Sequence, residues 1–272
     1  MPWDMLIAMA VPLVYGGLLL IESLRPAVRR KHSVGDEVRW QLAALGFFLL
    51  IGVINQAVSV VAPRLVPPRP LVPFGVLPLP VVFLTTFGLF TLGNALLHRA
   101  YHLHPGLWRH VHRYHHRPER MDVAGVMHQT PWEMTINAVL FTFVTVYVIE
   151  TPSTMRMVVA WTVSFYGMFQ HLNTATPRWL GWLIQRPESH SIHHQRRVHA
   201  YNYSDFPPWD WLMNTYRNPA GFVHDVGIRC DDGDDGSDRE ATSVYTAATV
   251  PTVSRRRSLR GDRRTPTRRR RR

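Results

Sequence analysis

The sequence has a single cysteine, Cys230, among its 272 residues, and this scarcity limits the chemistry that the chain can support. One thiol cannot form a disulfide within the chain. It also cannot supply the sets of thiolates that hold zinc-finger or iron–sulfur sites. A bound metal would therefore need nitrogen or oxygen ligands from the protein.

Charged residues are also scarce, at 18% of the chain against about 25% in ordinary proteins, whereas hydrophobic residues reach 46%. Much of the net charge of +12 comes from the end of the chain, because eleven arginines lie within residues 255–272. Residues 231–240 are mainly aspartate and glycine. Residues 228–272 lack apolar periodicity, so they are predicted to form a disordered tail, first acidic and then arginine-rich. We expect no nucleic-acid partner, since only charge favours one.

Five apolar segments predict helices that cross a membrane, which needs about 20 residues. The chain is therefore expected to be an all-α integral membrane protein, with about five transmembrane helices and a cytoplasmic, histidine-rich helical cap. The chain is expected to have three parts: N-terminal transmembrane helices in residues 1–73, a catalytic domain in residues 74–227, and the tail in residues 228–272. The five apolar segments are residues 5–24, 40–62, 74–97, 134–149 and 155–172.

Basic residues in the loops predict the orientation of these helices, because cytoplasmic loops are rich in lysine and arginine. The loop after the second apolar segment has only Arg64 and Arg69 as basic residues. The stretches that follow the first, third and fifth apolar segments are more basic. An external N-terminus places every strongly basic segment in the cytoplasm. The histidine clusters and the C-terminus are then expected to face the cytoplasm.

Histidine is unusually frequent, with fifteen residues, and most of them fall in clusters near the ends of the predicted helices. On a helix, residues i, i+3 and i+4 lie near one face, so each cluster can direct its imidazoles together. Nine converging nitrogens exceed what one ion can use, and two ions with four or five each would use them. The clusters are His98 and His102; His112, His115 and His116; and His190, His193 and His194; His171 lies at the end of the fifth segment.

The residues between these histidines argue against hydrolysis. The spacing of His98 and His102 resembles that of the zinc protease motif HExxH, but the intervening residues are Arg, Ala and Tyr, so no glutamate is present to activate water. A pair of redox metals at a membrane surface instead suggests dioxygen activation, with an apolar substrate that enters from the lipid. A non-enzymatic membrane metal-binding protein, such as a transporter or sensor, stays an alternative.

The order of the motifs resembles the sterol desaturase and fatty acid hydroxylase superfamily over about residues 89–216. Residues 108–116 resemble the first long histidine box of that family, and residues 121–123 resemble its Met-Asp-Val. The later motifs that also match are residues 169–173 (Phe-Gln-His-x-Asn), 187–194 (the C-terminal histidine box), Asn202 with Tyr203, Trp209 with Asp210, and Thr215 with Tyr216.

This resemblance implies a membrane-bound oxygenase that hydroxylates or desaturates a lipid, such as a sterol, a fatty acyl chain or a related isoprenoid. It implies two iron ions, for which zinc is a possible substitute, with dioxygen as co-substrate and no catalytic side chain beyond the metal centre. It also implies a separate electron donor of the cytochrome or ferredoxin/reductase type. A carotenoid or alkane hydroxylase with the same metal centre stays open, as does the oligomeric state. The implied ligands are His98, His102, His112, His115, His116, His171, His190, His193 and His194.

Three positions depart from the family pattern, and four further residues are candidates for supporting roles. Thr91 stands where the family often has aspartate, Thr130 where it often has histidine, and Ser204 where it has the glycine of Asn-Tyr-Gly. Metal-bound histidines usually donate their second ring nitrogen to a carboxylate or carbonyl. The additional ligands or supporting partners that we expect are His128, His199, Asp122 and Asn173.

Overall fold

The computed structural model describes residues 3–29, 32–73 and 75–229, with side chains from residue 10 onward. Every regular element in these residues is a helix, and the strand-like pairing is limited to two isolated bridges, Val72 with Ile149 and Gln195 with Val226. The all-α prediction is therefore confirmed for the described part of the chain. Nearly all of the predicted disordered tail, residues 230–272, lies outside the described residues.

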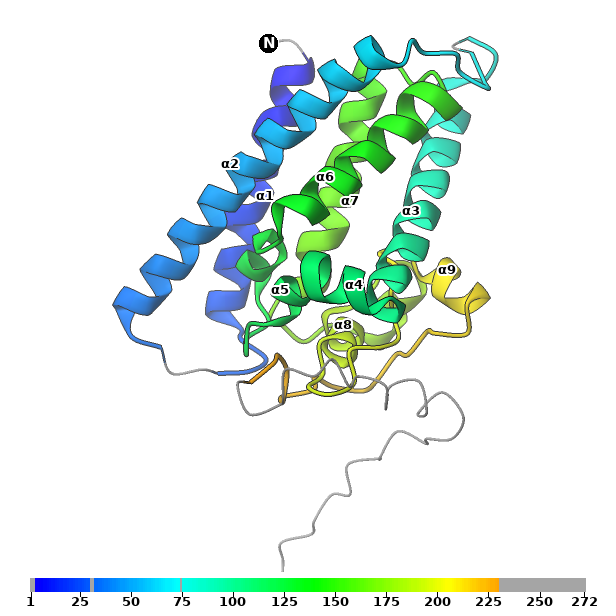
Figure 1. Cartoon of the computed structure of the whole chain (residues 1–272). Helices are drawn as coiled ribbons and strands as arrows, with labels where there is room; N and C mark the ends of the chain where they lie inside the picture. The colour runs from blue at the N-terminus through cyan, green and yellow to red at the C-terminus, as the bar shows by residue number, and fades with distance from the viewer. Residues whose placement is uncertain (1–2, 30–31, 74, 230–272) are drawn as a thin grey trace, which may run out of the picture.

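Five long helical segments stand side by side and form the body of the molecule (Figure 1). Each of them falls where the apolar runs predicted a helix. Helix α2 packs closely on α6, and α1 packs on α7. The segments are α1 (Trp3–Leu24), α2 (Val34–Leu65), α3 (Leu79–Leu103), α6 (Pro131–Thr142) with its π-helical continuation η3 (Phe143–Val148), and α7 (Ser153–His171).

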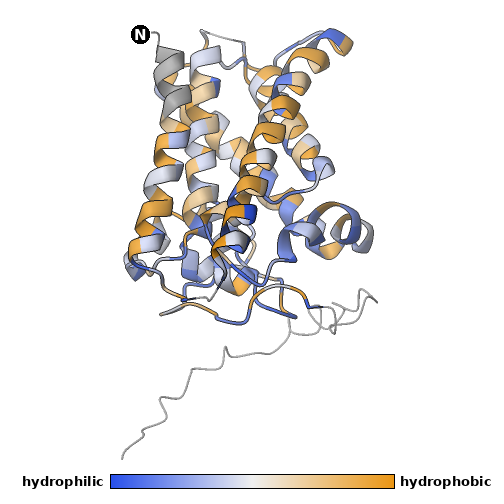
Figure 2. Ribbon diagram, turned by 90° about the vertical axis from the view of Figure 1, so that its left-hand side faces the viewer, coloured by the Kyte–Doolittle hydropathy of each residue, from blue (hydrophilic) through white to orange (hydrophobic). Residues whose placement is uncertain are grey.

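Two of these helices, α2 and α3, are long and apolar enough to cross a membrane. Large apolar side chains on α2 are exposed and are not covered by other parts of the described chain. Leu42, Leu49 and Val53 are 62%, 60% and 65% exposed. Figure 2 shows such hydrophobic residues along the long helices. An apolar surface this extensive is unfavourable in water, so α2 is suited to contact with lipid. The count of five spans and their orientation stay predictions.

Short helices gather at one end of the body and form the cap (Figure 1). Four of them connect the C-terminal end of α3 with the N-terminal end of α6, and the other three follow α7, so residues far apart in the sequence meet there. The division of the chain into three domains stays a prediction. The short helices are α4 (Pro105–Leu107), η1 (Trp108–His112), α5 (Arg113–His116), η2 (Val123–Met127), η4 (Arg178–Trp182), α8 (Pro187–His193) and α9 (Pro207–Leu212).

Helix starts near the cap are defined by local sequence. The Thr130 hydroxyl accepts a hydrogen bond from the Glu133 backbone N–H at 3.2 Å, which caps α6, and it donates to the Val111 carbonyl at 2.7 Å. Proline occupies the first turn of α6, α8 and α9, where a missing N–H costs no helical hydrogen bond. Thr130 therefore both starts α6 and joins it to η1, which contains His112.

Candidate metal centre

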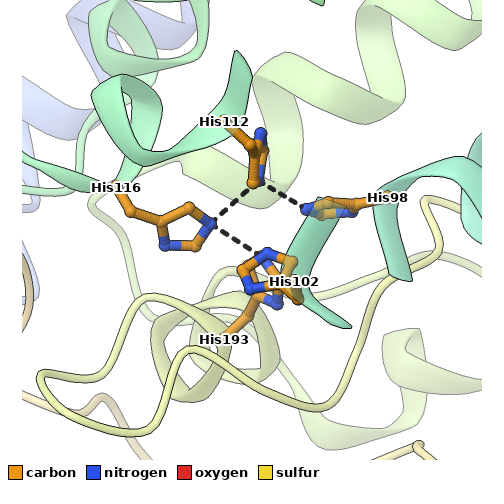
Figure 3. A group of neighbouring side chains, drawn as sticks. All are labelled: His98, His102, His112, His116 and His193. Atoms are coloured by element: carbon orange, nitrogen blue, oxygen red, sulfur yellow. Dashed lines mark hydrogen bonds between the residues drawn. The ribbon is translucent and has the colours of Figure 1, made fainter. Parts of the chain in front are cut away.

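The structure brings all nine histidines named from the sequence into two neighbouring groups. Within each group, the ligand atoms lie within 4.8 Å of one another. Figure 3 shows the larger group, in which the imidazoles from α3, η1, α5 and α8 point toward a common centre. Their role as metal ligands stays a proposal. The first group is His98, His102, His112, His116 and His193, and the second is His115, His171, His190 and His194.

Each HxxHH box is divided between the two groups. His112 and His116 join the first group, whereas His115 between them joins the second. The other box does the reverse, with His190 and His194 in the second group and His193 in the first. At about 100° per residue, positions i and i+4 are about 40° apart around the axis, whereas i+3 lies about 60° away on the other side of i. One box therefore provides ligands for two adjacent positions.

Three histidines of the first group are held in one orientation, because the Nδ1 of each donates a hydrogen bond to an oxygen acceptor. A neutral imidazole has only one N–H, so an Nδ1 that donates leaves Nε2 with a lone pair. The acceptors are two backbone carbonyls and one carboxylate. The contacts are His98 Nδ1 to the Tyr203 carbonyl at 2.7 Å, His193 Nδ1 to the Tyr201 carbonyl at 2.8 Å, and His112 Nδ1 to Glu133 Oε1 at 2.8 Å.

The Nε2 atoms of this group face one another at distances that fit ligands of a common cation. His112 Nε2 lies 2.9 Å from His98 Nε2 and 3.0 Å from His116 Nε2, and His193 Nε2 lies 3.1 Å from His116 Nε2. Two lone pairs at this distance repel each other unless a positive charge lies between them. Nitrogens about 2.1 Å from one ion and at right angles to each other are about 3.0 Å apart. The donor set of the first group therefore fits a metal ion.

The Nε2 atoms of the second group are packed as closely as those of the first, but its Nδ1 atoms have fewer hydrogen-bond partners outside the group. His190 Nε2 lies 3.0 Å from His171 Nε2 and 3.1 Å from His194 Nε2. Among the described residues, the buried Nδ1 atoms of His171 and His190 have no hydrogen-bond partner. Such atoms are costly to bury, which indicates that the histidines are retained for a ligand rather than for stability. Neutral imidazoles suit iron and zinc alike.

Burial keeps the cap histidines neutral, which is the form that binds a metal. It lowers the pKa of His112 and of His115 to about 3. Burial also holds the pKa values of His190, His193 and His194 well below the ordinary 6.5, and neighbouring imidazoles lower them further. At neutral pH no proton competes with a metal for these nitrogens.

We expect the metal-free protein to lose thermal stability as the pH falls from about 7.5 to about 6. Unfolded histidines titrate near 6.5, whereas His112 and His115 titrate near 3 in the fold, so only the unfolded chain takes up protons. Each histidine exposed on unfolding then costs about 0.8 kcal/mol at pH 6. Burial raises the pKa of Glu133 to about 8 and the pKa values of Asp205 and Asp210 to about 6, so these three carboxyl groups take up protons in the fold over the same range and oppose the trend. The nine grouped histidines outnumber them, so the net effect is a loss of stability. Apparent Tm of metal-stripped protein in detergent would measure this, and a Tm that is constant or rises on acidification would contradict it.

Two of the four expected supporting residues anchor the fold instead of contacting a histidine. Asp122 accepts hydrogen bonds from Trp40 Nε1 and the Gly125 N–H, both at 3.0 Å, and so ties η2 to α2. Asn173 pairs with the backbone of Val28, at 2.9 Å in both directions. Their carboxylate and amide suited a supporting role by type, but the chain turns them toward the N-terminal helices.

The two histidines among these candidates also have different positions. His199 Nδ1 lies 3.2 Å from His116 Nδ1, so it contacts a member of the first group from outside. His128 belongs to neither group; its ring stacks on Trp40 with centroids 3.7 Å apart. It therefore does not fill the place of the histidine that the family has where Thr130 stands.

Several supporting residues were missed or given no role by the sequence. The carbonyls of Tyr201 and Tyr203 hold His193 and His98, and no side-chain pattern reports a backbone carbonyl. Tyr201 and Asn202 have φ values of 67° and 47°, so the loop that presents these carbonyls is bent through left-handed conformations. Glu133, which accepts from His112 Nδ1, has only its spacing from Thr130 as a sequence signal, and that spacing marks the start of a helix and not a partner of a histidine.

The loop 201–206 is held by Asp210, which explains the Trp-Asp motif. Asp210 accepts hydrogen bonds from the N–H groups of Tyr203 and Ser204, both at 2.9 Å, and from the Thr215 hydroxyl at 2.6 Å. Ser204 is not among the residues with positive φ, so a side chain fits where the family has glycine. Thr91 accepts a hydrogen bond from Trp209 Nε1 at 2.9 Å and joins α3 to α9.

Helix α8, which together with its C-cap residue His194 contributes three of the nine histidines, is fastened by a buried arginine. The Arg186 guanidinium pairs with Glu188 at 2.9 Å and donates to the carbonyls of Thr176 and Pro219 at 2.6 and 3.0 Å. Glu188 in turn accepts from the N–H of Thr176 at 2.6 Å and from its hydroxyl at 2.8 Å. Both side chains are almost completely buried. This network fixes the start of α8 against the segment that follows α7.

A cavity of about 660 Å³ lies between α2, α3, α6 and α7 and reaches both histidine groups. His98 and His112 of the first group line it, together with His115, His171 and His190 of the second. Its volume falls in the range of small-molecule sites. A molecule in this cavity can therefore contact both groups at once.

Comparison with known proteins agrees with this geometry. The family model for fatty acid hydroxylase matches residues 82–215, a range that contains all nine grouped histidines. No curated protein matched the chain, and no solved structure did. The matched range also contains the supporting residues Glu133, Tyr201 and Tyr203. Residues 82–215 therefore match the fatty acid hydroxylase family, of the sterol desaturase and fatty acid hydroxylase superfamily, and this family implies an oxidoreductase.

Proposed function

We propose that the protein is a membrane-bound di-iron oxygenase that hydroxylates or desaturates a lipid with dioxygen and external electrons. The observation that carries the proposal is the pair of buried histidine groups, of five and four members, that open on one cavity. One ion in each group would use all nine nitrogens. Zinc would fit the same donors, but it has no redox chemistry.

The residues that would hold the metals are the nine grouped histidines, and the chain's other residues orient them. Two bound irons would supply the oxidising power for an unactivated C–H bond, which side chains cannot supply. Glu133 and the carbonyls of Tyr201 and Tyr203 hold the protons on Nδ1 and leave Nε2 free for the metal. The apolar part of the cavity would align the chain of the lipid and exclude water.

The overall reaction has a defined balance. In hydroxylation, one oxygen atom enters the C–H bond to give an alcohol, and the other leaves as water with two electrons and two protons. In desaturation, two hydrogens leave the substrate, and both oxygen atoms become water with the same two electrons and two protons. The electrons are proposed to come from a separate cytochrome or ferredoxin/reductase donor, at the cytoplasmic side of the membrane.

The first experiment is to measure metal content and product together. Purified protein in detergent is expected to contain about two irons per chain, and in a reducing system to oxidise co-purified lipid. Under labelled dioxygen, hydroxylation would place one labelled atom in the lipid, whereas desaturation would give labelled water. Two zincs without turnover after iron reconstitution, or no metal at all, would contradict the oxygenase and favour a non-enzymatic role.

A further inference from the structure

The cavity has three zones along its length, and the zone farthest from the histidines is polar. At the histidine end it meets the candidate metal centre. Between the two ends, most of the lining is apolar, with aromatic and aliphatic side chains such as Phe48, Ala160 and Val163, interrupted by the polar Asn94, Asn137 and Ser164. At the far end, α2 contributes amide and hydroxyl side chains, and the α6–α7 corner contributes hydroxyls and an arginine. These polar residues are Asn55, Gln56, Ser59, Thr142, Thr145, Ser153 and Arg156.

Arg156 is the one cation among the side chains that line this cavity, apart from the histidines. It lies in the first turn of α7 and is half-buried. In the part of the chain that the structure describes, its guanidinium has no hydrogen-bond or ion-pair partner. By contrast, Asn55 and Ser59 donate to carbonyls of their own helix, Ile51 and Gln56. Arg156 is therefore the group at this end that needs a partner from outside the chain.

The length of α7 gives the distance between the polar end and the histidine end of the cavity, because this helix runs along the cavity from Arg156 to His171. These residues are fifteen positions apart, so they are separated by about 22 Å along the helix axis. One leaflet of fluid lipid chains is only about 15 Å deep, because the hydrocarbon core of a bilayer is about 30 Å thick. A molecule that reaches both ends is therefore a long chain near full extension.

We propose that the cavity binds a long, single-chain amphiphile by an anionic head group at Arg156, with its chain directed toward the histidine groups. A guanidinium favours a carboxylate, which it can bind with two parallel hydrogen bonds. The apolar middle zone favours the chain. A long-chain fatty acid has this chemistry, and its carboxylate lies at the end of the cavity opposite the metal centre.

This placement also specifies which carbons react, and that part rests on the proposed function. The carbons nearest the histidines are those far from the carboxylate. Oxidation is therefore expected near the methyl end of the chain, and the reacting carbon is counted from the anchored carboxylate. The binding part of the proposal does not depend on turnover.

Photolabelling tests the binding without requiring activity. Full-length protein in phosphatidylcholine vesicles is exposed to hexadecanoic acid that carries a diazirine near its methyl end, with hexadecanoic acid or hexadecanol as competitor. The label is expected on cavity residues near the histidines, such as Phe90 and Met168. The acid should compete at a concentration about 10-fold lower than the alcohol, since a hydrogen-bonded ion pair is lost with the alcohol.

Three variants define the role of Arg156. Arg156→Gln is expected to weaken competition by the acid about 10-fold and to leave the alcohol unchanged, whereas Arg156→Lys should keep most of the preference. The matched control is Arg64→Gln, because Arg64 lies at the same end of the molecule, in the last turn of α2, but outside the cavity. It should behave as the unaltered protein.

The outcomes separate this proposal from its rivals. Equal competition by acid and alcohol in the unaltered protein would overturn it, and so would an unchanged preference in a folded Arg156→Gln protein. Arg156 would then be an interfacial anchor for the phosphates of bilayer lipids. Labelling as expected, without iron and without oxidised product, would support the binding site and defeat the oxygenase instead.

Discussion

Replacing His193 by alanine is expected to abolish product formation and to lower the metal content of the purified protein. His193 belongs to the first group, and its Nε2 lies 3.1 Å from that of His116. Losing only an outer partner of a metal ligand typically costs 10–100-fold in affinity or activity, so losing the ligand itself should cost more than about 100-fold. Metal per chain and dioxygen-dependent product would both be measured.

The same substitution at His115 tests the second group. His115 is buried and belongs to the group of four, so its loss leaves three nitrogens there. The matched control is His110→Ala, because His110 is exposed, lies in the same stretch of helix and belongs to neither group. Full activity in both His115→Ala and His193→Ala would show that the groups are not the catalytic centre.

Arg186→Met is expected to be the most destabilising substitution in the cap. It removes the partner of Glu188 and leaves a buried carboxylate without its cation. Breaking a buried pair in this way costs about 3–5 kcal/mol, which corresponds to a fall of about 10 °C in apparent Tm. Scanning fluorimetry in detergent would measure the change, and metal content should fall with it because α8 and its C-cap residue His194 carry three of the nine histidines.

A double variant separates charge from packing at this position. In Arg186→Met with Glu188→Gln, both charges are gone, and the amide can keep part of the bonding to Thr176. The loss in Tm should then be smaller than in the single variant, because replacing both partners of a buried pair is tolerated better than removing one. A double variant as unstable as the single one would show that the guanidinium's bonds to backbone carbonyls, and not the ion pair, hold α8.

The positions that depart from the family pattern have roles in this fold that their side chains can fill. Thr130 caps α6 and contacts η1, so it orders the helix start that carries Glu133. Thr91 joins α3 to Trp209 of α9. Both residues join neighbouring helices, and neither belongs to a histidine group. These departures from the family pattern therefore leave the two histidine groups intact.

The sequence by itself was sufficient to predict the positions of the five long helices and the identity of the nine histidines that gather in the cap. A run of apolar residues predicts a helix because its side chains must all be buried in protein or lipid, and this depends only on local composition. The i, i+3 and i+4 spacing likewise follows from helix geometry alone. Even a supporting residue such as Glu133 stood in a recognisable helix start.

Only the tertiary structure decided how these pieces meet. The division of each HxxHH box between two groups depends on how α5 and α8 are rotated against α3 and α7. The carbonyl of Tyr203 reaches His98 from more than 100 positions away, and Asp122 turns to α2 instead of to a histidine. In the sequence Arg156 is an isolated basic residue, and only the packing of α2 and α6 beside α7 places it in the lining of a cavity. Contacts between distant segments depend on packing and on long-range hydrogen bonds, for which no local pattern in the chain provides a signal.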